Sequence, residues 1–211
     1  MKVLIEKRFP SLYHILKAIY CFYLHYRCLK FIHKKETTQI EYPFLCTRPQ
    51  NVFLDEFVRI NPGAKFIIAS GKLIVKKYSE IAYGSTIVTG NHVPTVGIPQ
   101  YVLGHTHIND KEQDTIIEED VWVGANVTLL CGAHLGRGCI VGACSLVNKN
   151  IPPYAVVGGI PARIISSKFT LEQILKHEEK LYPEQERLSR SYLEELFATY
   201  YVGMRSMGKD S

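Results

Sequence analysis

The sequence lacks several features that would place it quickly in a class. Its six cysteines show no paired C-x-x-C spacing, which favours free thiols in a reducing cytoplasm over a disulfide framework. No cleavable signal peptide is evident, because the first apolar run starts late and no small-residue cleavage site follows it. We therefore expect a cytoplasmic protein.

Strong charge is also absent. The formal net charge is +5 in 211 residues. The sequence contains 46% hydrophobic and 21% charged residues, which is typical of a globular protein. A nucleic-acid-binding protein would carry a denser basic stripe with interleaved aromatic residues on a recognisable module. The sequence has no such module, so we expect no nucleic-acid partner.

A period of six residues is the main positive feature. Aliphatic residues recur at this spacing in Ile117, Val123, Leu129, Leu135, Val141 and Val147. Small or apolar residues follow four positions after each, in Val121, Val127, Ala133, Cys139, Ser145 and Ile151. A helix repeats its apolar face near 3.6 residues and a strand near 2, so neither explains the pattern. It predicts short strands wound into a parallel β-helix whose interior is filled by these side chains.

The same period starts at Leu54, slips across residues 69–72, and resumes from Val75 to Ile87. Ile87 and Ile117 are separated by a multiple of six, so the chain can leave the coil near Gly90 and return in register. The intervening residues 91–114 are rich in loop-forming and polar residues. Loops this long are usually functional. We expect the β-helix over residues 51–168, with an excursion loop at 91–114.

Residues 1–50 are expected to form an N-terminal helical segment, with the helical pattern over 1–35. Lys17 and Arg27 interrupt its apolar residues, so it is not a clear membrane span. Two alternatives stay open. The helix packs on the coil or on a neighbouring subunit, because a helix that is apolar nearly all round is usually buried. Alternatively, it is an aromatic, basic helix that lies on the inner face of a membrane as a peripheral contact.

Residues 169–211 are expected to form C-terminal helices. Thr170 and Gln173 have the spacing of a capping box, and Pro183 is predicted to begin a second helix. Because a solenoid needs its apolar ends covered, the helices and the coil are expected to form one domain.

Three stretches resemble those of a known family. Residues 121–127 read VWVGANV, residues 151–163 read IPPYAVVGGIPAR, and residues 89–92 read TGNH just before the excursion loop. In order and spacing they are similar to hexapeptide-repeat acyltransferases, in the branch that contains galactoside, maltose and xenobiotic acetyltransferases and capsular-polysaccharide O-acetyltransferases. The resemblance covers about residues 50–168. It implies a mainly β fold, a left-handed parallel β-helix, and a homotrimer with active sites between neighbouring coils.

The resemblance places the catalytic base at His92. A neutral imidazole can take a proton from a sugar hydroxyl near neutral pH, and the family transfers the acetyl group directly, without an acyl-enzyme.

Trp122 lies outside both inward series and should project outward. We expect Trp122 and Asn91 to bind the acceptor, although an apolar contact between subunits is an equal alternative for Trp122.

Contacts to acetyl-CoA are implied at six matching positions. Small residues would let backbone groups approach the pantetheine arm, and cations suit the phosphates of the nucleotide. The positions are Gly124, Ala125 and Ala143 for the pantetheine arm and Asn148, Lys149 and Arg163 for the nucleotide. The family's pattern has Thr and Asp where Asn148 and Asn150 flank the lysine here.

Two other functions are alternatives to acetyl transfer. His105, His107 and Asp110 could form part of a metal site, and some coils of this architecture are zinc carbonic anhydrases. Those enzymes have a histidine pair five residues apart with an arginine upstream, which this sequence lacks, so no metal is expected. A purely structural trimer is the second alternative, and the combination of His92, Trp122 and the cationic end argues against it.

The sequence therefore predicts an acetyl-CoA-dependent acetyltransferase. The expected acceptor is a sugar hydroxyl of a surface polysaccharide or of its precursor, because a helix suited to a membrane surface would bring the enzyme to such a precursor. A small diffusible acceptor, such as a simple glycoside, a xenobiotic or an amino sugar, is the alternative.

Overall fold

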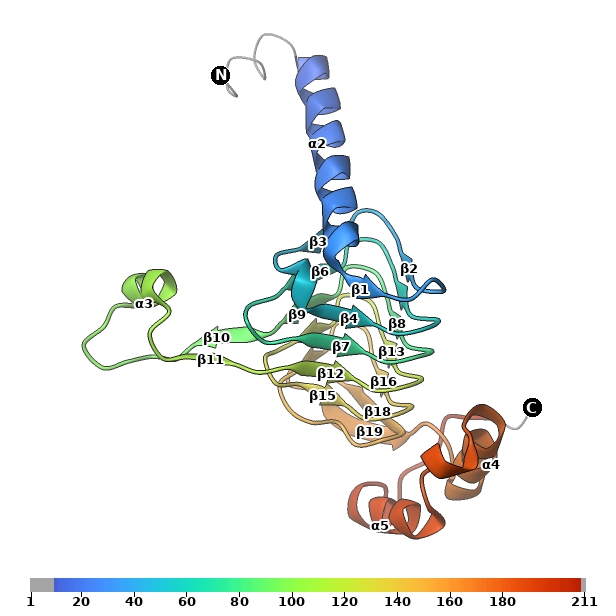
Figure 1. Ribbon diagram of the computed structural model, residues 1–211. Helices are drawn as coiled ribbons and strands as arrows, with labels where there is room; N and C mark the ends of the chain where they lie inside the picture. The colour runs from blue at the N-terminus through green and yellow to red at the C-terminus, as the bar shows by residue number, and fades with distance from the viewer. Residues whose placement is uncertain (1–9, 210–211) are drawn as a thin grey trace.

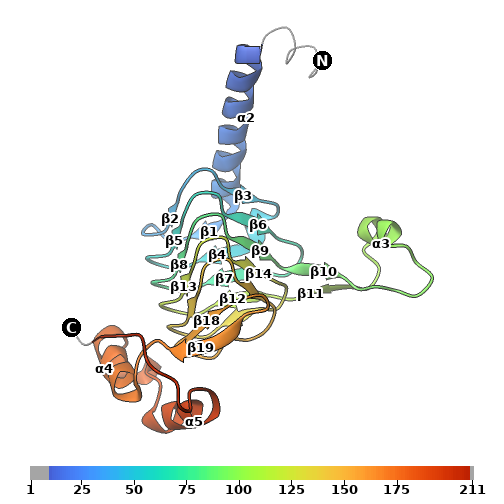
Figure 2. The same ribbon diagram turned by 180° about the vertical axis from the view of Figure 1, so that it is seen from behind.

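The computed structural model describes residues 10–209 and shows a coil of short parallel strands with helices beyond both of its ends (Figures 1 and 2). Each turn of the coil contributes one strand to each of three sheets. The residues expected to be helical before position 10 lie outside the described part of the chain.

The first sheet has the order β1 (His33–Lys34), β4 (Val52–Leu54), β7 (Leu73–Val75), β12 (Thr115–Ile117) and β15 (His134–Leu135). The second runs through β2 (Gln39–Ile40), β5 (Arg59–Ile60), β8 (Glu80–Ile81), β13 (Trp122–Val123), β16 (Ile140–Val141), β18 (Ala155–Gly158) and β19 (Arg163–Ser167). The third runs through β3 (Leu45–Cys46), β6 (Lys65–Ile67), β9 (Thr86–Val88), β14 (Thr128–Leu129) and β17 (Leu146–Val147). Only β19 pairs antiparallel within these sheets as described, where the chain turns back along β18.

The interior of the coil confirms the six-residue pattern. Every residue of the first series from Ile117 to Val147 is 0% exposed, and those of the second series are at most 3% exposed. Register explains why: Val123 pairs with Ile81 on one neighbouring turn and with Val141 on the other, so equivalent side chains stack. Burial raises the pKa of the Cys139 thiol well above its usual range, which suits its role as a small core residue.

The coil begins earlier than residue 51, where the sequence pattern placed it. Strands β1, β2 and β3 form a first turn between His33 and Cys46. The interior residues of this turn include Thr38, Phe44 and Cys46, which are buried but are not an aliphatic series. Their mixed character hid the turn from a search for aliphatic residues at six-residue spacing.

Within the described residues the N-terminal helix α2 covers Pro10–Phe31, so it ends before position 35, and most of it is not packed along the coil. It ends at Phe31, because the chain turns there into β1 and buries Ile32 in the core. Both views show α2 standing away from the end of the coil (Figures 1 and 2). The expectation of a helix packed on its own coil is therefore wrong for most of its length.

The C-terminal helices close the opposite end. Helix α4 (Leu171–Leu181) begins with the predicted capping box of Thr170 and Gln173. Pro183, however, precedes only a 3-10 turn, η2 (Glu184–Glu186), and α5 (Arg190–Tyr200) starts after an N-cap at Ser189. The short polar stretch after Pro183 explains the difference. A second 3-10 turn, η1 (Pro49–Asn51), links β3 to β4.

Buried ion pairs fix these helices to the coil. Arg137 pairs with Glu119 at 3.1 Å and with Glu178 of α4 at 3.0 Å. The hydroxyl of Tyr154, which is fully buried, donates to Glu178 at 2.6 Å. Because these partners satisfy the charge of Glu178, α4 can cover the last turn without leaving a buried carboxylate unpaired.

Close stacking of the turns makes a specific prediction at Gly136. A Cβ placed there would lie 2.5 Å from the backbone nitrogen of Pro153 and 2.8 Å from the carbonyl oxygen of Ile151. We expect Gly136→Ala to lower the free energy of unfolding by about 1–3 kcal/mol, the usual cost of overpacking. Gly104→Ala is the control, because no atom lies within 4 Å of its Cβ position. Denaturant unfolding at equal protein concentration measures both, and equal stability of the two variants would contradict the prediction.

Candidate active site

The excursion from the coil is an ordered arm. After β9 the chain forms β10 (Gly90–His92), then α3 (Gln100–Thr106), and returns through β11 (Asp110–Glu112) to β12. Strands β10 and β11 pair antiparallel, with His92 opposite Asp110. The arm projects sideways from the coil with α3 near its tip (Figure 1). The predicted base His92 therefore sits on a two-stranded support and not on a structureless loop.

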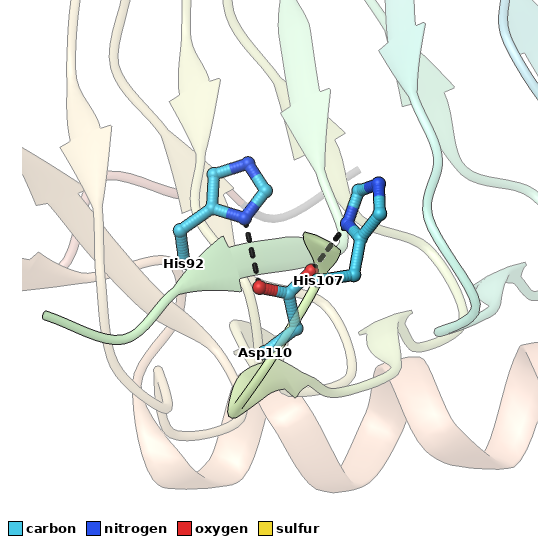
Figure 3. A group of neighbouring side chains, drawn as sticks. All are labelled: His92, His107 and Asp110. Atoms are coloured by element: carbon cyan, nitrogen blue, oxygen red, sulfur yellow. Dashed lines mark hydrogen bonds and ion pairs between the residues drawn. The ribbon is translucent and has the colours of Figure 1, made fainter. Parts of the chain in front are cut away.

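Two histidines share one carboxylate at the outer end of the β10–β11 ribbon (Figure 3). The Nδ1 atom of His92 lies 2.8 Å from Oδ1 of Asp110, and Nδ1 of His107 lies 2.7 Å from Oδ2. The Asp110 side chain is 11% exposed, whereas that of His92 is 46% exposed. The carboxylate is thus covered by the two rings, while the imidazole of His92 remains open to solvent.

The protonation of the cluster follows from its hydrogen bonds. The bonds from His92 and His107 hold the pKa of the Asp110 carboxyl below its ordinary value, so it is ionised near neutral pH. An ionised carboxylate only accepts hydrogen bonds, so each Nδ1 must carry a proton. The neutral His92 ring therefore keeps its lone pair on Nε2. This is the tautomer that a general base needs, with Nδ1–H held by a carboxylate.

Local geometry explains how His107 and Asp110 reach His92. His107 ends helix α3 in the left-handed conformation, with φ of 53°, and its backbone N–H donates to Leu103 at 2.9 Å. Glycine is the usual residue at such a helix end, so a histidine is unusual there. The turn places Asp110 at the first position of β11, opposite His92.

Sequence reasoning named His107 and Asp110 only as part of a possible metal site and did not connect them with His92. The side chain of His105, grouped with them, instead bonds the carbonyl oxygen of Tyr101 at 2.8 Å. Antiparallel pairing of the two halves of the excursion loop is the signal that would have placed Asp110 opposite His92.

The same three side chains have the donor set of a metal site. One ligand atom from each of His92, His107 and Asp110 lies within 4.8 Å of the others. Two imidazoles and one carboxylate can bind a transition metal. Here, however, the nitrogens that face the carboxylate are at hydrogen-bonding distance from it. That arrangement satisfies all three groups without requiring an ion.

The small residues predicted for the pantetheine arm lie together at one corner of the coil, between the second and third sheets. The carbonyl of Ala125 accepts the N–H of Cys144 from the next turn at 2.8 Å, beside Ala143. A Cβ at Gly124 would lie 2.7 Å from the backbone nitrogen of Ala143. The close stacking of the turns by itself therefore requires glycine at position 124. Ala143, by contrast, is exposed.

Trp122 and the residues predicted for the nucleotide end are all exposed. The Trp122 side chain projects outward from β13, as expected, with 54% of the residue exposed. Asn148 and Lys149 directly follow β17. At the other end of β17, the N–H of Ala162, next to Arg163, donates to Leu146 at 2.8 Å. Lys149 and Arg163 thus flank the same strand on the last turns of the coil.

Within one chain these groups occupy different corners. The arm with Asn91 and His92 leaves the coil between the third and first sheets, whereas Trp122, Gly124, Ala125 and Ala143 follow the edge between the second and third. The structure therefore brings His107 and Asp110 to His92, and the small residues to one another. Within residues 10–209 these two groups therefore lie at separate corners of the coil.

Comparison with known proteins gives the class. The family model "Bacterial transferase hexapeptide (six repeats)" matches residues 114–149. A probable macrolide acetyltransferase from Lysinibacillus sphaericus is 36% identical over 151 residues, which cover 61% of this chain and 84% of that protein. A chloramphenicol acetyltransferase from Klebsiella aerogenes is 44% identical over 64 residues, 30% of each chain. The chain thus spans less than a third of the length of that relative.

Two further matches, one in sequence and one in structure, are also to acetyltransferases. A putative lipopolysaccharide biosynthesis O-acetyl transferase from Escherichia coli K12 is 29% identical over 138 residues, covering 57% of this chain and 66% of that protein. The fold is similar to the crystal structure of a hexapeptide-repeat acetyltransferase from Vibrio cholerae complexed with acetyl-CoA, with a TM-score of 0.61 and 22% identity over 69% of this chain and 76% of the other. This chain belongs to the hexapeptide-repeat acetyltransferase family, and its coil is the left-handed parallel β-helix of that family.

Proposed function

We propose that the protein transfers an acetyl group from acetyl-CoA to a hydroxyl of a carbohydrate, in a surface polysaccharide or its precursor. The observation that carries this proposal is the His92 imidazole, which is held through Nδ1 by Asp110 and is open at Nε2. Membership of an acetyltransferase family supports the donor. The lipopolysaccharide O-acetyl transferase among the relatives supports the acceptor class.

The proposed reaction is a direct transfer. The Nε2 atom of His92 removes the proton of the acceptor hydroxyl as its oxygen attacks the thioester carbonyl carbon. A backbone N–H stabilises the oxyanion of the tetrahedral intermediate. The carbon–sulfur bond then breaks, and the His92 imidazolium returns the proton to the departing thiolate. The products are the O-acetyl ester and coenzyme A, and His92 is again neutral.

Asp110 is proposed as a positioning residue in this reaction. Its carboxylate fixes the tautomer and orientation of His92, and it stabilises the imidazolium that forms during transfer. His107 occupies the second carboxylate oxygen and thereby prevents Asp110 from turning away. The step as written uses only the side chains of this cluster.

We further propose that the site is completed between copies of the chain in a homotrimer. His92 and the corner formed by Gly124, Ala125 and Ala143 lie at different edges of one coil, so a neighbouring coil would bring the acetyl-CoA-binding corner to the arm. Lys149, Asn148 and Arg163 would then hold the nucleotide phosphates, and Trp122 and Asn91 the acceptor. Their exposure in the single chain is compatible with these roles.

A small diffusible acceptor is the second candidate. The relatives include proteins described as macrolide and chloramphenicol acetyltransferases, and the same base can serve a hydroxyl of such a compound. The two candidates differ only in the acceptor, so one assay separates them.

Release of free thiol separates the two classes of acceptor. Release of free thiol from acetyl-CoA is measured with sugars, polysaccharide fragments, amines and hydroxyl-bearing antibiotics as acceptors. We expect acceptor-dependent release with a carbohydrate hydroxyl, and a decrease in kcat of about 10²–10⁴-fold in His92→Ala, the usual contribution of a positioned base.

His105→Ala is the matched control, because His105 lies on the same arm but outside the cluster. We expect it to keep wild-type turnover. Normal turnover in a folded His92→Ala variant would remove His92 from the mechanism, and no turnover with any acceptor would count against the enzyme assignment.

Asp110→Asn tests the positioning role. His92 and His107 each contact a different oxygen of Asp110, and in Asn one of these oxygens becomes an NH2 group that cannot accept, so the two contacts cannot both be kept in place. We expect kcat to fall by roughly 10–100-fold, while KM for acetyl-CoA stays the same. Steady-state kinetics separates the two parameters, and an unchanged kcat would exclude the role.

The pH profile provides a second readout for Asp110. Because the Asp110 pKa is lowered, its carboxylate is protonated, and its bonds to the histidines lost, only below the ordinary carboxyl range. Between about pH 8 and pH 5 the Asp110 carboxylate of the wild-type enzyme therefore stays ionised and keeps its bonds to both histidines. The acidic limb should change in Asp110→Asn and not in His105→Ala.

Lys149 is expected to act on donor binding. Removing one cation that contacts phosphate should raise KM for acetyl-CoA about tenfold in Lys149→Ala, with little change in kcat. Lys176→Ala, which removes an exposed lysine from α4, is the control. Equal KM values for both variants would place Lys149 outside the donor site.

A further inference from the structure

Helix α2 has no role in the proposed reaction and almost no contact with the coil. Its 22 residues extend about 33 Å at 1.5 Å per residue. Near its C-terminal end the Sγ of Cys28 lies 3.5 Å from the carbonyl oxygen of Cys46, and the Phe22 ring lies 6.4 Å from that of Tyr42. The remainder stands away from the protein in both views (Figures 1 and 2).

The surface of the helix is apolar and aromatic on several sides. Six large residues of the helix are between 55% and 64% exposed: Ile15, Ile19, Tyr20, Phe22, Tyr23 and Tyr26. Exposed apolar patches of this kind mark interaction sites. Tyrosine in particular is enriched where a membrane meets water, because its ring is apolar and its hydroxyl is polar.

The net charge of the chain is concentrated in the same segment. Residues 10–35 contain Lys17, Arg27, Lys30, Lys34 and Lys35 and no Asp or Glu. These five cations equal the formal net charge of the whole chain, +5, so the rest of the sequence is balanced. Within residues 10–209, none of the five has an ion-pair partner. A partner that is both apolar and anionic would match this segment.

An apolar groove continues this surface toward the coil. It has a volume of about 470 Å³ and is lined by Cys21 and Cys28 of α2 and by Tyr42, Phe44 and Cys46 of the first turn. Its size and apolar walls suit part of a hydrocarbon chain. The groove shows that the apolar surface does not stop where the helix meets the coil.

We propose that α2 attaches the protein to an anionic lipid bilayer at its surface. The helix would contact the headgroup and upper acyl region with its tyrosines and aliphatic residues, while the five cations face anionic headgroups. The contact is peripheral, because no helix among the described residues is long and apolar enough to cross a bilayer. Attachment does not depend on acetyl transfer and can be measured without it.

A second copy of the chain is the main competing occupant. Leu12, Ile15, Ile19 and Phe22 have the three- and four-residue spacing of a coiled-coil seam. Such a seam would leave Tyr20 and Tyr23 uncovered, and it would bring together helices that carry only positive charge. Without Glu or Asp in the segment, no ion pair between helices could offset that repulsion. An anionic lipid surface would cover the tyrosines and would attract the positive charges.

Flotation of the full chain with vesicles tests the proposal. We expect binding to vesicles of phosphatidylcholine with about 30 mol% phosphatidylglycerol, little binding to phosphatidylcholine alone, and weaker binding as salt is raised. Neutralising three cations in Lys17→Gln, Arg27→Gln, Lys30→Gln should lower the partition coefficient on the order of 100-fold. Absence of wild-type binding to the anionic vesicles would overturn the proposal.

Two further variants complete the test. Lys176→Gln, Arg205→Gln, Lys209→Gln makes the same change in charge at exposed positions beyond the other end of the coil and should bind like the wild type. Ile19→Ser, Tyr20→Ser, Tyr23→Ser should reduce binding at least tenfold while its oligomeric state stays the same. If that variant instead changes the oligomeric state and keeps wild-type vesicle binding, the occupant is a second copy and the proposal is wrong. Turnover on a soluble acceptor should not change in any of the three, so failure of the acetyltransferase assignment would be seen separately.

Discussion

The in-register stacking of successive turns is the constraint on which the rest of the structure depends. Each short strand has too few hydrogen bonds to be stable alone. Strands in the middle of the coil are paired in parallel on both sides by strands about twenty or forty residues away, as β13 is with β8 and β16. A shift of one residue would expose the whole inward set of side chains. Register must therefore be kept from turn to turn, and it is kept on both sides of the excursion arm, where β12 pairs with β7.

This constraint separates packing from chemistry. The inward positions are occupied by buried aliphatic and small residues, and some inward polar residues bond to the backbone of the neighbouring turn. The hydroxyl of Ser79, for example, donates to the carbonyl of Glu118 at 2.7 Å and accepts the N–H of Val121 at 3.0 Å. Reactive groups are left to the corners and to the outward faces. The arm departs from such a corner, and β12 resumes pairing with β7 directly after it, so the arm can vary without disturbing the register.

The repeat made most of the coil predictable, because one physical requirement recurs in every turn. The first turn could not be predicted in the same way, since Thr38, Phe44 and Cys46 fill its interior without an aliphatic period. The cluster around His92 was only partly predictable. A motif identified His92, but its contact with Asp110 spans 18 residues and depends on how the arm folds back on itself. Periodicity carries no information about such a contact.

The two ends of the coil satisfy the need for a cover in different ways. At the C-terminal end, Ile174, Leu193 and Leu196 join the continuous core, so α4 and α5 act as a cap. At the N-terminal end, Ile32 and Phe44 already join the same core, which leaves most of α2 unnecessary for covering the coil.

An isolated helix is only marginally stable in water, and most helical stability in proteins comes from packing of an apolar face. Helix α2 contacts its own coil only near its C-terminal end, so a surface outside the coil would add to its stability. This is the physical reason to seek a partner for α2, and the concentration of positive charge along it limits the chemistry that the partner can have.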